Sequence, residues 1–201
     1  MSTEISAKLV KQLRDATGVG MMECKAALQE ANGDLEQATL ILRKRGLAQA
    51  AKKAGRTTSQ GLIGSYIHMG GTIGVLVELN CESDFVAKTE DFQNLLREIA
   101  LQVAAANPQY VSRDQIPAEV IEREKSVYRG QMENSGKPPQ VIEKIIEGKL
   151  GAFYEQVCLV DQLSIRESKQ TVNAMLQAAI AKLGENISVS RFVRFKVGEG
   201  R

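Results

Sequence analysis

The first 45 residues alternate amphipathic stretches with short breaks. Between residues 4 and 16, apolar side chains recur at the spacing of one helical face, at Ile5, Leu9, Leu13 and Ala16. After a glycine-rich break, a second helix is expected over residues 22–31. Asp34 is a good N-cap for a third helix, which we expect to end at Gly46 because three cations precede that glycine. The pattern predicts a three-helix bundle.

From residue 62 the period of the pattern changes. Two β-rich runs, residues 62–69 and 72–79, flank Gly70 and Gly71 and predict a hairpin. The last run, residues 187–197, alternates with period two, and Arg191 is the polar exception on its apolar side. The remaining helices are expected over residues 84–106, 118–131, 139–154 and 171–183. This order predicts an α+β domain whose three-stranded antiparallel sheet is flanked by helices.

The domain organisation follows from a change in composition. Residues 47–60 are rich in alanine, then basic, then polar, and we interpret them as a helical linker that ends at a domain boundary. The predicted domains are residues 1–54, the three-helix bundle, and residues 55–201, the α+β core and dimerisation domain.

Composition narrows the class of protein. Hydrophobic residues make up 43% and charged residues 25%, as in a globular protein, and the net charge of +2 does not suit a nucleic-acid coat. No secretory signal precedes the first helix, and no apolar run reaches the ~20 residues that span a bilayer, so we expect a cytoplasmic protein with no membrane partner. Cys24, Cys81 and Cys158 lack metal-ligand spacing and are expected to be buried free thiols.

Candidate catalytic groups are sparse. His68 is the only histidine, and because it falls within a predicted strand we expect a structural or surface role. Carboxylates cluster at Glu78, Glu82, Asp84, Glu90 and Asp91, and their spacing alone does not exclude a glycosidase-type pair. Aromatic residues, which usually line such sites, are only 4% of the chain. We therefore expect no enzyme, no cofactor and no metal.

A basic run raises a second possibility. Six cations fall within residues 43–56, at Arg43, Lys44, Arg45, Lys52, Lys53 and Arg56. This pattern is typical of nucleic-acid binding, but no aromatic or glycine-rich RNA-binding motif accompanies it. We favour a solvated helix end and linker, and expect no direct nucleic-acid contact.

Two features are poorly explained by folding alone. Met21 and Met22 follow a glycine-rich loop, and two successive residues at a helix start do not both face inward. After the predicted hairpin, Phe85 lies beside Asp84 in a polar segment. The ring either anchors the following helix or is displayed to a partner, and the residues by themselves leave both readings open.

At these residues the chain resembles the elongation factor Ts family. Residues 9–28, LVKQLRDATGVGMMECKAAL, resemble the N-terminal signature of that family. Residues 80–87, NCESDFVA, resemble its second signature, with Ser83 in place of the usual Thr. Residues 191–200, RFVRFKVGEG, are similar to the last strand of the family's core.

The resemblance implies a fold, a partner and two sets of site residues. It implies that the bundle is ubiquitin-associated-like, and that the protein binds elongation factor Tu with GDP and promotes GDP release without covalent chemistry. The residues implied to contact the nucleotide-binding domain of this GTPase are Lys11, Arg14, Met21 and Met22. Those implied to form a wedge beside its magnesium site are Ser83, Asp84, Phe85 and Val86.

The chain resembles a short form of the family. Longer members carry two related core subdomains, an inserted helical hairpin and a helical C-terminal extension, whereas one core unit is visible in this sequence. We therefore predict a homodimer in which a second copy takes the place of the missing subdomain, because two-fold interfaces are the commonest form of self-association.

Overall fold

A computed structural model describes residues 5–133 and 135–199. Its chain divides into two compact units, of which the first comprises residues 1–62, 79–95 and 174–188. The second comprises residues 63–78, 96–173 and 189–201. The predicted boundary between residues 54 and 55 stays a prediction. The expected helix start at Glu4 and the last residue of the final motif, Gly200, lie outside the described residues.

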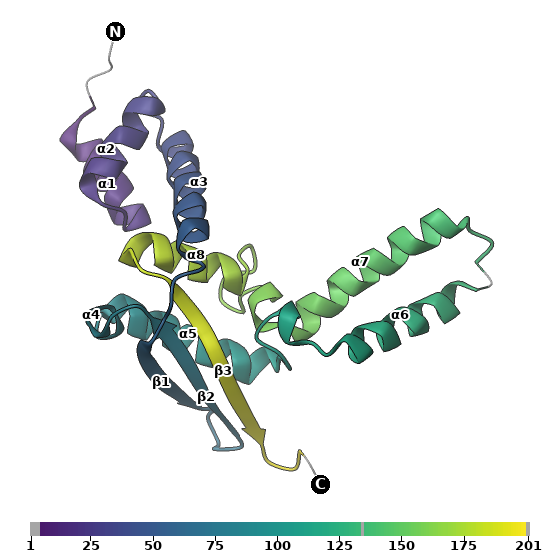
Figure 1. The fold of residues 1–201 in the computed structure, drawn as a ribbon. Helices are drawn as coiled ribbons and strands as arrows, with labels where there is room; N and C mark the ends of the chain where they lie inside the picture. Colours follow the sequence, from purple (N-terminus) through teal and green to yellow (C-terminus); the bar gives the residue numbers. More distant parts are fainter. Residues whose placement is uncertain (1–4, 134, 200–201) are drawn as a thin grey trace. The chain divides into compact units, whose positions relative to one another are not determined.

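The N-terminal part of the first unit is a bundle of α1 (Ala7–Thr17), α2 (Met21–Glu30) and α3 (Leu35–Lys53), shown in purple and blue in Figure 1. Its core contains the fully buried Leu13, Cys24 and Leu28. Asp34 caps α3 as predicted, since its carboxylate accepts a hydrogen bond of 2.9 Å from the Gln37 N–H.

The third helix is longer than predicted, because it continues through Gly46 to Lys53. Gly46 is a packing position. A Cβ added there would lie 3.0 Å from the Cβ of Ala181 in α8 (Val172–Leu183), so the missing side chain permits a close approach between two helices. The alanine-rich run after Gly46 has high helix propensity and carries the helix onward.

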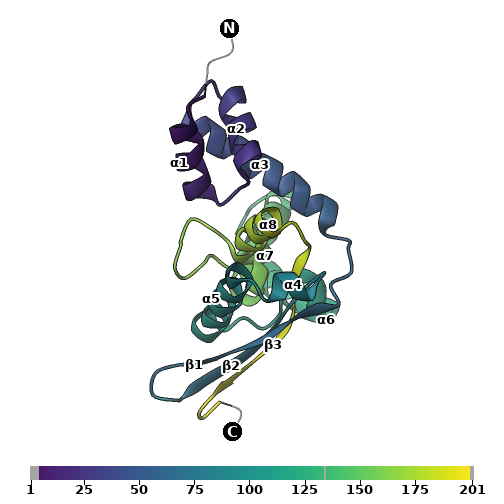
Figure 2. The ribbon, with the colours of Figure 1, turned by 90° about the vertical axis from the view of Figure 1, so that its left-hand side faces the viewer.

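The predicted sheet is present, and its strands lie in the order β1, β2, β3. They are β1 (Gln60–Ile67), β2 (Ile73–Cys81) and β3 (Ile187–Lys196), and Figure 2 shows them from the side. Gly70 and Gly71, both with positive φ, form the hairpin turn. His68 lies in this turn and not within the strand as predicted, because β1 ends at Ile67.

The predicted helix over residues 84–106 is in fact two helices. They are α4 (Asp84–Ala87) and α5 (Glu90–Ala106), and Lys88 and Thr89 separate them. The Thr89 hydroxyl donates to the Val86 carbonyl at 2.7 Å and accepts from the Phe92 N–H at 3.3 Å. It therefore ends one helix and caps the next. In the second unit, α5 covers one face of the sheet, where Arg194 Nε donates to the Ala104 carbonyl at 3.2 Å.

Strand β3 does not keep one face inward along its whole length. Ile187 and Val189 are buried as the predicted alternation requires, but Val193 and Phe195, on the same side of that alternation, are exposed. Two successive exposed residues, Ser190 and Arg191, shift the pattern by one position. Local irregularities of this kind re-aim the side chains that follow.

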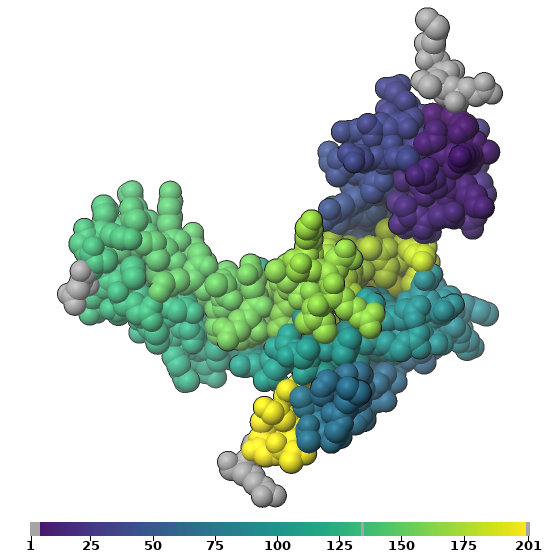
Figure 3. All heavy atoms as spheres, turned by 180° about the vertical axis from the view of Figure 1, so that it is seen from behind, coloured from purple at the N-terminus to yellow at the C-terminus, as the bar shows by residue number. Residues whose placement is uncertain are grey.

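The second unit also contains a helical hairpin of α6 (Ala118–Met132) and α7 (Pro139–Val157), drawn in green in Figure 1, and the atoms of this segment are the green spheres of Figure 3. A small cluster of Ile116, Val157 and Cys158 is buried at its base, beside two short 3₁₀ turns, Arg113–Gln115 and Leu159–Asp161. Both helices match the predicted segments to within three residues. Within residues 5–133 and 135–199, no helix combines the length and the apolar character that crossing a membrane requires.

Candidate partner-binding surfaces

The first candidate surface combines a face of α1 with the start of α2. Lys11 and Arg14 are both exposed on α1, three residues apart and therefore on neighbouring positions of one helical face. Met21 is 54% exposed and Met22 is 77% exposed in the first turn of α2. We refer to these four residues as the α1–α2 surface.

The burial of Cys24 sets the direction in which the two methionines point. Its thiol donates to the Val19 carbonyl at 3.5 Å and lies in the core of the bundle. Met22 lies two positions before Cys24 and therefore points to the opposite side of α2, where it is 77% exposed. Met21 lies three positions before Cys24, nearer its side of the helix, but in the first turn it is still 54% exposed. The start of α2 thus presents two adaptable thioether side chains to solvent.

The second candidate surface follows directly from the buried end of β2. Ser83 caps α4, and its hydroxyl accepts a hydrogen bond of 3.4 Å from the Val86 N–H. Within this helix Val86 is half-buried, while Phe85 is 78% exposed. Phe85 is therefore exposed and does not anchor the following helix, in which the fully buried ring is that of Phe92. The display of Phe85 to a partner stays a prediction. We call residues Ser83, Asp84, Phe85 and Val86 the wedge.

Lys88 neutralises the acidic member of the wedge. Its Nζ donates to the Asp84 carboxylate at 2.6 Å, and this hydrogen bond holds the pKa of Asp84 below its ordinary value. The same Nζ lies 5.9 Å from the centre of the Phe85 ring. An ionised carboxylate and an exposed cation therefore lie beside the exposed ring.

Three of the four remaining carboxylates of the predicted cluster take part in ion pairs. Glu78 pairs with Arg191 at 2.7 Å, and Asp91 pairs with Lys182 at 2.7 Å. Glu82 lies 3.5 Å from Arg56. In the part of the chain that the structure describes, no three acidic, histidine or cysteine side chains are grouped as metal ligands would be.

Half of the basic run makes contacts within the protein. Arg45 pairs with Glu30, Lys53 donates to the Gly184 carbonyl at 2.7 Å, and Arg56 lies beside Glu82. These contacts fix α3 and the segment after it, and they give three of the six cations a structural role. They favour the interpretation of this run as a helix end and linker.

The cysteines are buried free thiols, as predicted. For Cys158, burial raises the pKa to about 11. Since the thiolate is the reactive form, this residue should stay protonated and inert at pH 8. We expect iodoacetamide to label Cys158 at least about tenfold more slowly in the native protein than in urea. Mass spectrometry of the digested chain measures this ratio, and equal rates would contradict the burial.

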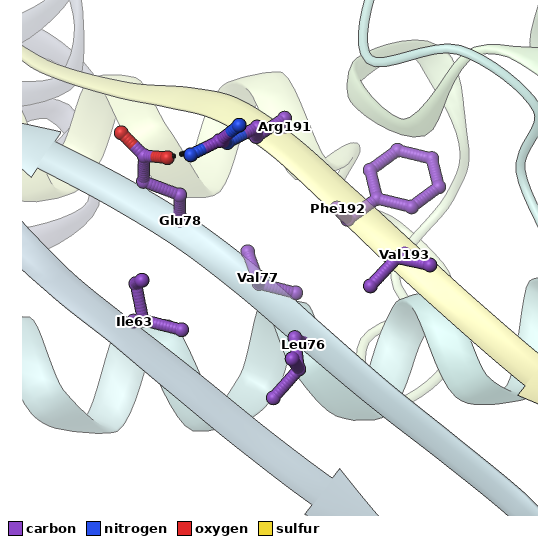
Figure 4. Close-up of a pocket in the computed structure, with 7 residues that line it drawn as sticks. All are labelled: Ile63, Leu76, Val77, Glu78, Arg191, Phe192 and Val193. Atoms are coloured by element: carbon purple, nitrogen blue, oxygen red, sulfur yellow. Dashed lines mark hydrogen bonds and ion pairs between the residues drawn. The ribbon is translucent and has the colours of Figure 1, made fainter.

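A third surface is the face of the sheet opposite α5. A pocket of about 270 Å³ opens here, lined by residues of all three strands that Figure 4 labels. The dashed contact between Glu78 and Arg191 crosses from β2 to β3. Around it the face is apolar, with Ile63, Ile67, Leu76, Val193 and Phe195 all exposed. We call these five residues the open sheet face.

Comparison with known proteins identifies the family. The family described as Elongation factor TS matches residues 25–199. The chain belongs to the elongation factor Ts family. It is 61% identical over 196 residues to elongation factor Ts of Fervidobacterium nodosum, covering 98% of this chain and 100% of that protein. It is 62% identical over 195 residues to elongation factor Ts of Thermosipho melanesiensis, covering 97% and 100%.

Within this elongation factor Ts fold, the α1–α2 surface and the wedge belong to the same compact unit but lie on separate elements. One residue at the wedge escaped the sequence analysis. Glu185 accepts hydrogen bonds from Glu82 and Ser83, although it lies 102 residues beyond Ser83. Glu185 lies between a glycine and an asparagine, which is the composition of an ordinary turn, so the neighbouring sequence gives no indication of its contact with Ser83.

Proposed function

We propose that this protein is a guanine-nucleotide exchange factor that binds elongation factor Tu with GDP and promotes GDP release, so that GTP can rebind. The observation that carries the proposal is the exposure of Phe85, which is 78% exposed on a capped turn next to an ionised carboxylate. Such a ring contributes little to its own fold and is well placed to enter a partner. The proposed site of action is the cytoplasm.

The exchange mechanism rests on thermodynamic linkage. A protein that binds the empty GTPase more tightly than the GDP form must weaken GDP binding by the same factor. Each tenfold loss of nucleotide affinity needs about 1.4 kcal/mol of differential binding. An aromatic side chain inserted into a pocket can contribute more than that, since buried rings are typical hot spots of interfaces.

The charge of Asp84 adds an electrostatic contribution. The magnesium ion of a GTPase neutralises the phosphates of its nucleotide, so any displacement of that ion weakens GDP binding. In the proposed complex, the wedge places Phe85 and Asp84 next to this ion. The hydrogen bond from Lys88 holds the Asp84 carboxylate in place on the surface of α4 before the encounter.

Direct measurement of nucleotide release tests the proposal. Elongation factor Tu is loaded with fluorescent GDP, mixed with the purified chain and excess unlabelled GDP, and followed by stopped flow. We expect release to accelerate in proportion to the concentration of the chain until it saturates. Release at the intrinsic rate over the whole concentration range would overturn the proposed function.

The α1–α2 surface is proposed to dock on the nucleotide-binding domain of the GTPase, and its methionines provide a test. For the double variant Met21→Ala/Met22→Ala, we expect the half-saturating concentration to rise about tenfold while the saturated release rate stays within about twofold. The physical reason is that these docking contacts persist throughout the reaction. Their loss therefore weakens the affinity of the chain for the GTPase but does not change the rate of GDP release within the complex. A lower saturated rate at unchanged half-saturation would contradict this role.

We also propose that the protein is a homodimer joined through the open sheet face. The outer face of an antiparallel sheet is usually polar, whereas Ile63, Ile67 and Phe195 are all more than 60% exposed here. Apolar surface of this kind marks an interaction site. A second copy of the same face would cover it with a matching apolar surface, as two-fold interfaces do.

A further inference from the structure

Glu185 holds the wedge from the turn that connects α8 to β3. Its Oε2 accepts hydrogen bonds from the Glu82 N–H at 3.1 Å and the Ser83 N–H at 2.9 Å. Its Oε1 accepts a hydrogen bond of 2.6 Å from the Ser83 hydroxyl. Three donors from two successive residues therefore converge on one carboxylate, and hydrogen bonds to an ionised acceptor are stronger than neutral ones.

These bonds also determine how Ser83 caps α4. The Ser83 hydroxyl has a single proton, and that proton is directed to Glu185. Its lone pairs then accept from the Val86 N–H on the other side. A hydroxyl polarised by a carboxylate is a better acceptor, so the two bonds strengthen one another. The cap of the helix that carries Phe85 is thereby linked to Glu185.

A hydrogen bond in the opposite direction also joins residues 82–83 to residues 185–186. The Glu82 carboxylate accepts a hydrogen bond of 2.7 Å from the Asn186 N–H. The buried amide of Asn186 donates in turn to the Arg56 carbonyl at 2.8 Å. Each segment therefore donates backbone N–H groups to a carboxylate of the other: residues 82 and 83 donate to Glu185, and Asn186 donates to Glu82. These reciprocal hydrogen bonds hold the two segments in one register.

The short helix α4 needs such support. It has only four residues, and a single helical turn has no stability of its own. The ring that it carries is 78% exposed, so packing against the core contributes little to holding it. The orientation of Phe85 therefore depends on Ser83 and the groups that hold it at the start of the helix, together with Thr89 and the buried Ala87 at its end.

We propose that Glu185 is a positioning residue for nucleotide exchange, which fixes the wedge before it enters the GTPase. This inference rests on the proposed exchange function. When Phe85 inserts into the GTPase, it can displace groups of the nucleotide site only if α4, which carries the ring, keeps its position. If the wedge were mobile, part of its binding energy would be lost in ordering it during the encounter.

Three variants test the proposal in the full-length chain with GDP-loaded elongation factor Tu. For Glu185→Ala we expect the saturated GDP release rate to fall about tenfold, with half-saturation within about twofold because the α1–α2 surface is untouched. Glu185→Gln keeps the shape and an oxygen acceptor for the two N–H groups, so we expect only about a threefold loss. Glu147→Ala removes an exposed carboxylate from α7 and should leave the rate unchanged.

A double variant shows whether Glu185 acts through the ring. If it does, Glu185→Ala/Phe85→Ala should release GDP no more slowly than Phe85→Ala alone, because residues that act as a unit are not additive. Amide hydrogen exchange should also quicken at Glu82, Ser83 and Val86 in Glu185→Ala while the buried amides of α5 keep their protection.

The outcomes separate the two proposals. A slower Phe85→Ala together with an unchanged Glu185→Ala would overturn the role of Glu185 and leave the wedge intact. Multiplicative rate losses in the double variant would also overturn it, since Glu185 would then act elsewhere. An unchanged rate in Phe85→Ala would instead overturn the wedge itself.

Discussion

Replacing Phe85 by alanine should slow the saturated release of GDP from elongation factor Tu about thirtyfold, which corresponds to about 2 kcal/mol for an aromatic hot spot. The ring is 78% exposed, so its loss removes little packing from this chain. We expect the free energy of unfolding to change by less than about 0.5 kcal/mol. The variant should therefore separate exchange from folding, with stopped flow measuring the first and urea titration the second.

Two matched variants complete this test. Phe92→Ala removes the next aromatic residue, which is fully buried, and should cost about 3–5 kcal/mol of stability. Val127→Ala trims an exposed apolar side chain on α6 and should change neither measurement. A Phe85→Ala protein that releases GDP at the wild-type rate would show that the exposed ring has another purpose. Large destabilisation in the same variant would show that the ring belongs to the fold.

The bundle and the hairpin were predictable because their signals are local. The cap at Asp34 and the glycines at 70 and 71 act within a few residues of the elements that they delimit. Gly46 was misread for the same reason. A glycine after three cations has the composition of a helix end, and only the neighbouring Ala181 reveals that it is a point of close packing.

The wedge shows a similar division between local and distant information. The pairing of Asp84 with Phe85 in a polar segment drew attention to these residues but left the exposure of the ring open, and only the family resemblance implied that they form a wedge. The short helix that carries them was not predictable, because the Thr89 hydroxyl decides where α4 ends. The support from Glu185 was also unpredictable, since it crosses 102 residues of sequence to reach Ser83.

The alternating pattern of β3 predicted the burial of only half of the strand correctly. A period-two pattern predicts one buried face, and the buried half of the strand follows it at Ile187 and Val189. Beyond Arg191 the same apolar parity points to the open side of the sheet. The prediction of a buried apolar face was therefore wrong for Val193 and Phe195, which are exposed.

Phe195→Asp should convert the proposed dimer into monomers. Phe195 is 67% exposed on β3, and in a dimer through the open sheet face an aspartate there would be buried without a partner. An unpaired buried charge costs several kcal/mol, so we expect the dimer dissociation constant to rise about a thousandfold, or about 4 kcal/mol. Sedimentation at micromolar concentration should then show only the 22.0 kDa chain.

Val141→Asp is the matched control, because Val141 is an exposed valine on α7, away from the sheet. It should sediment as the wild type does. The ion pair of Glu78 with Arg191 is compatible with burial of this face, because both charges are already matched within one chain. A wild-type protein that sediments as a monomer up to about 100 μM would contradict the proposed dimer, since a stable interface of ordinary size associates well below that concentration.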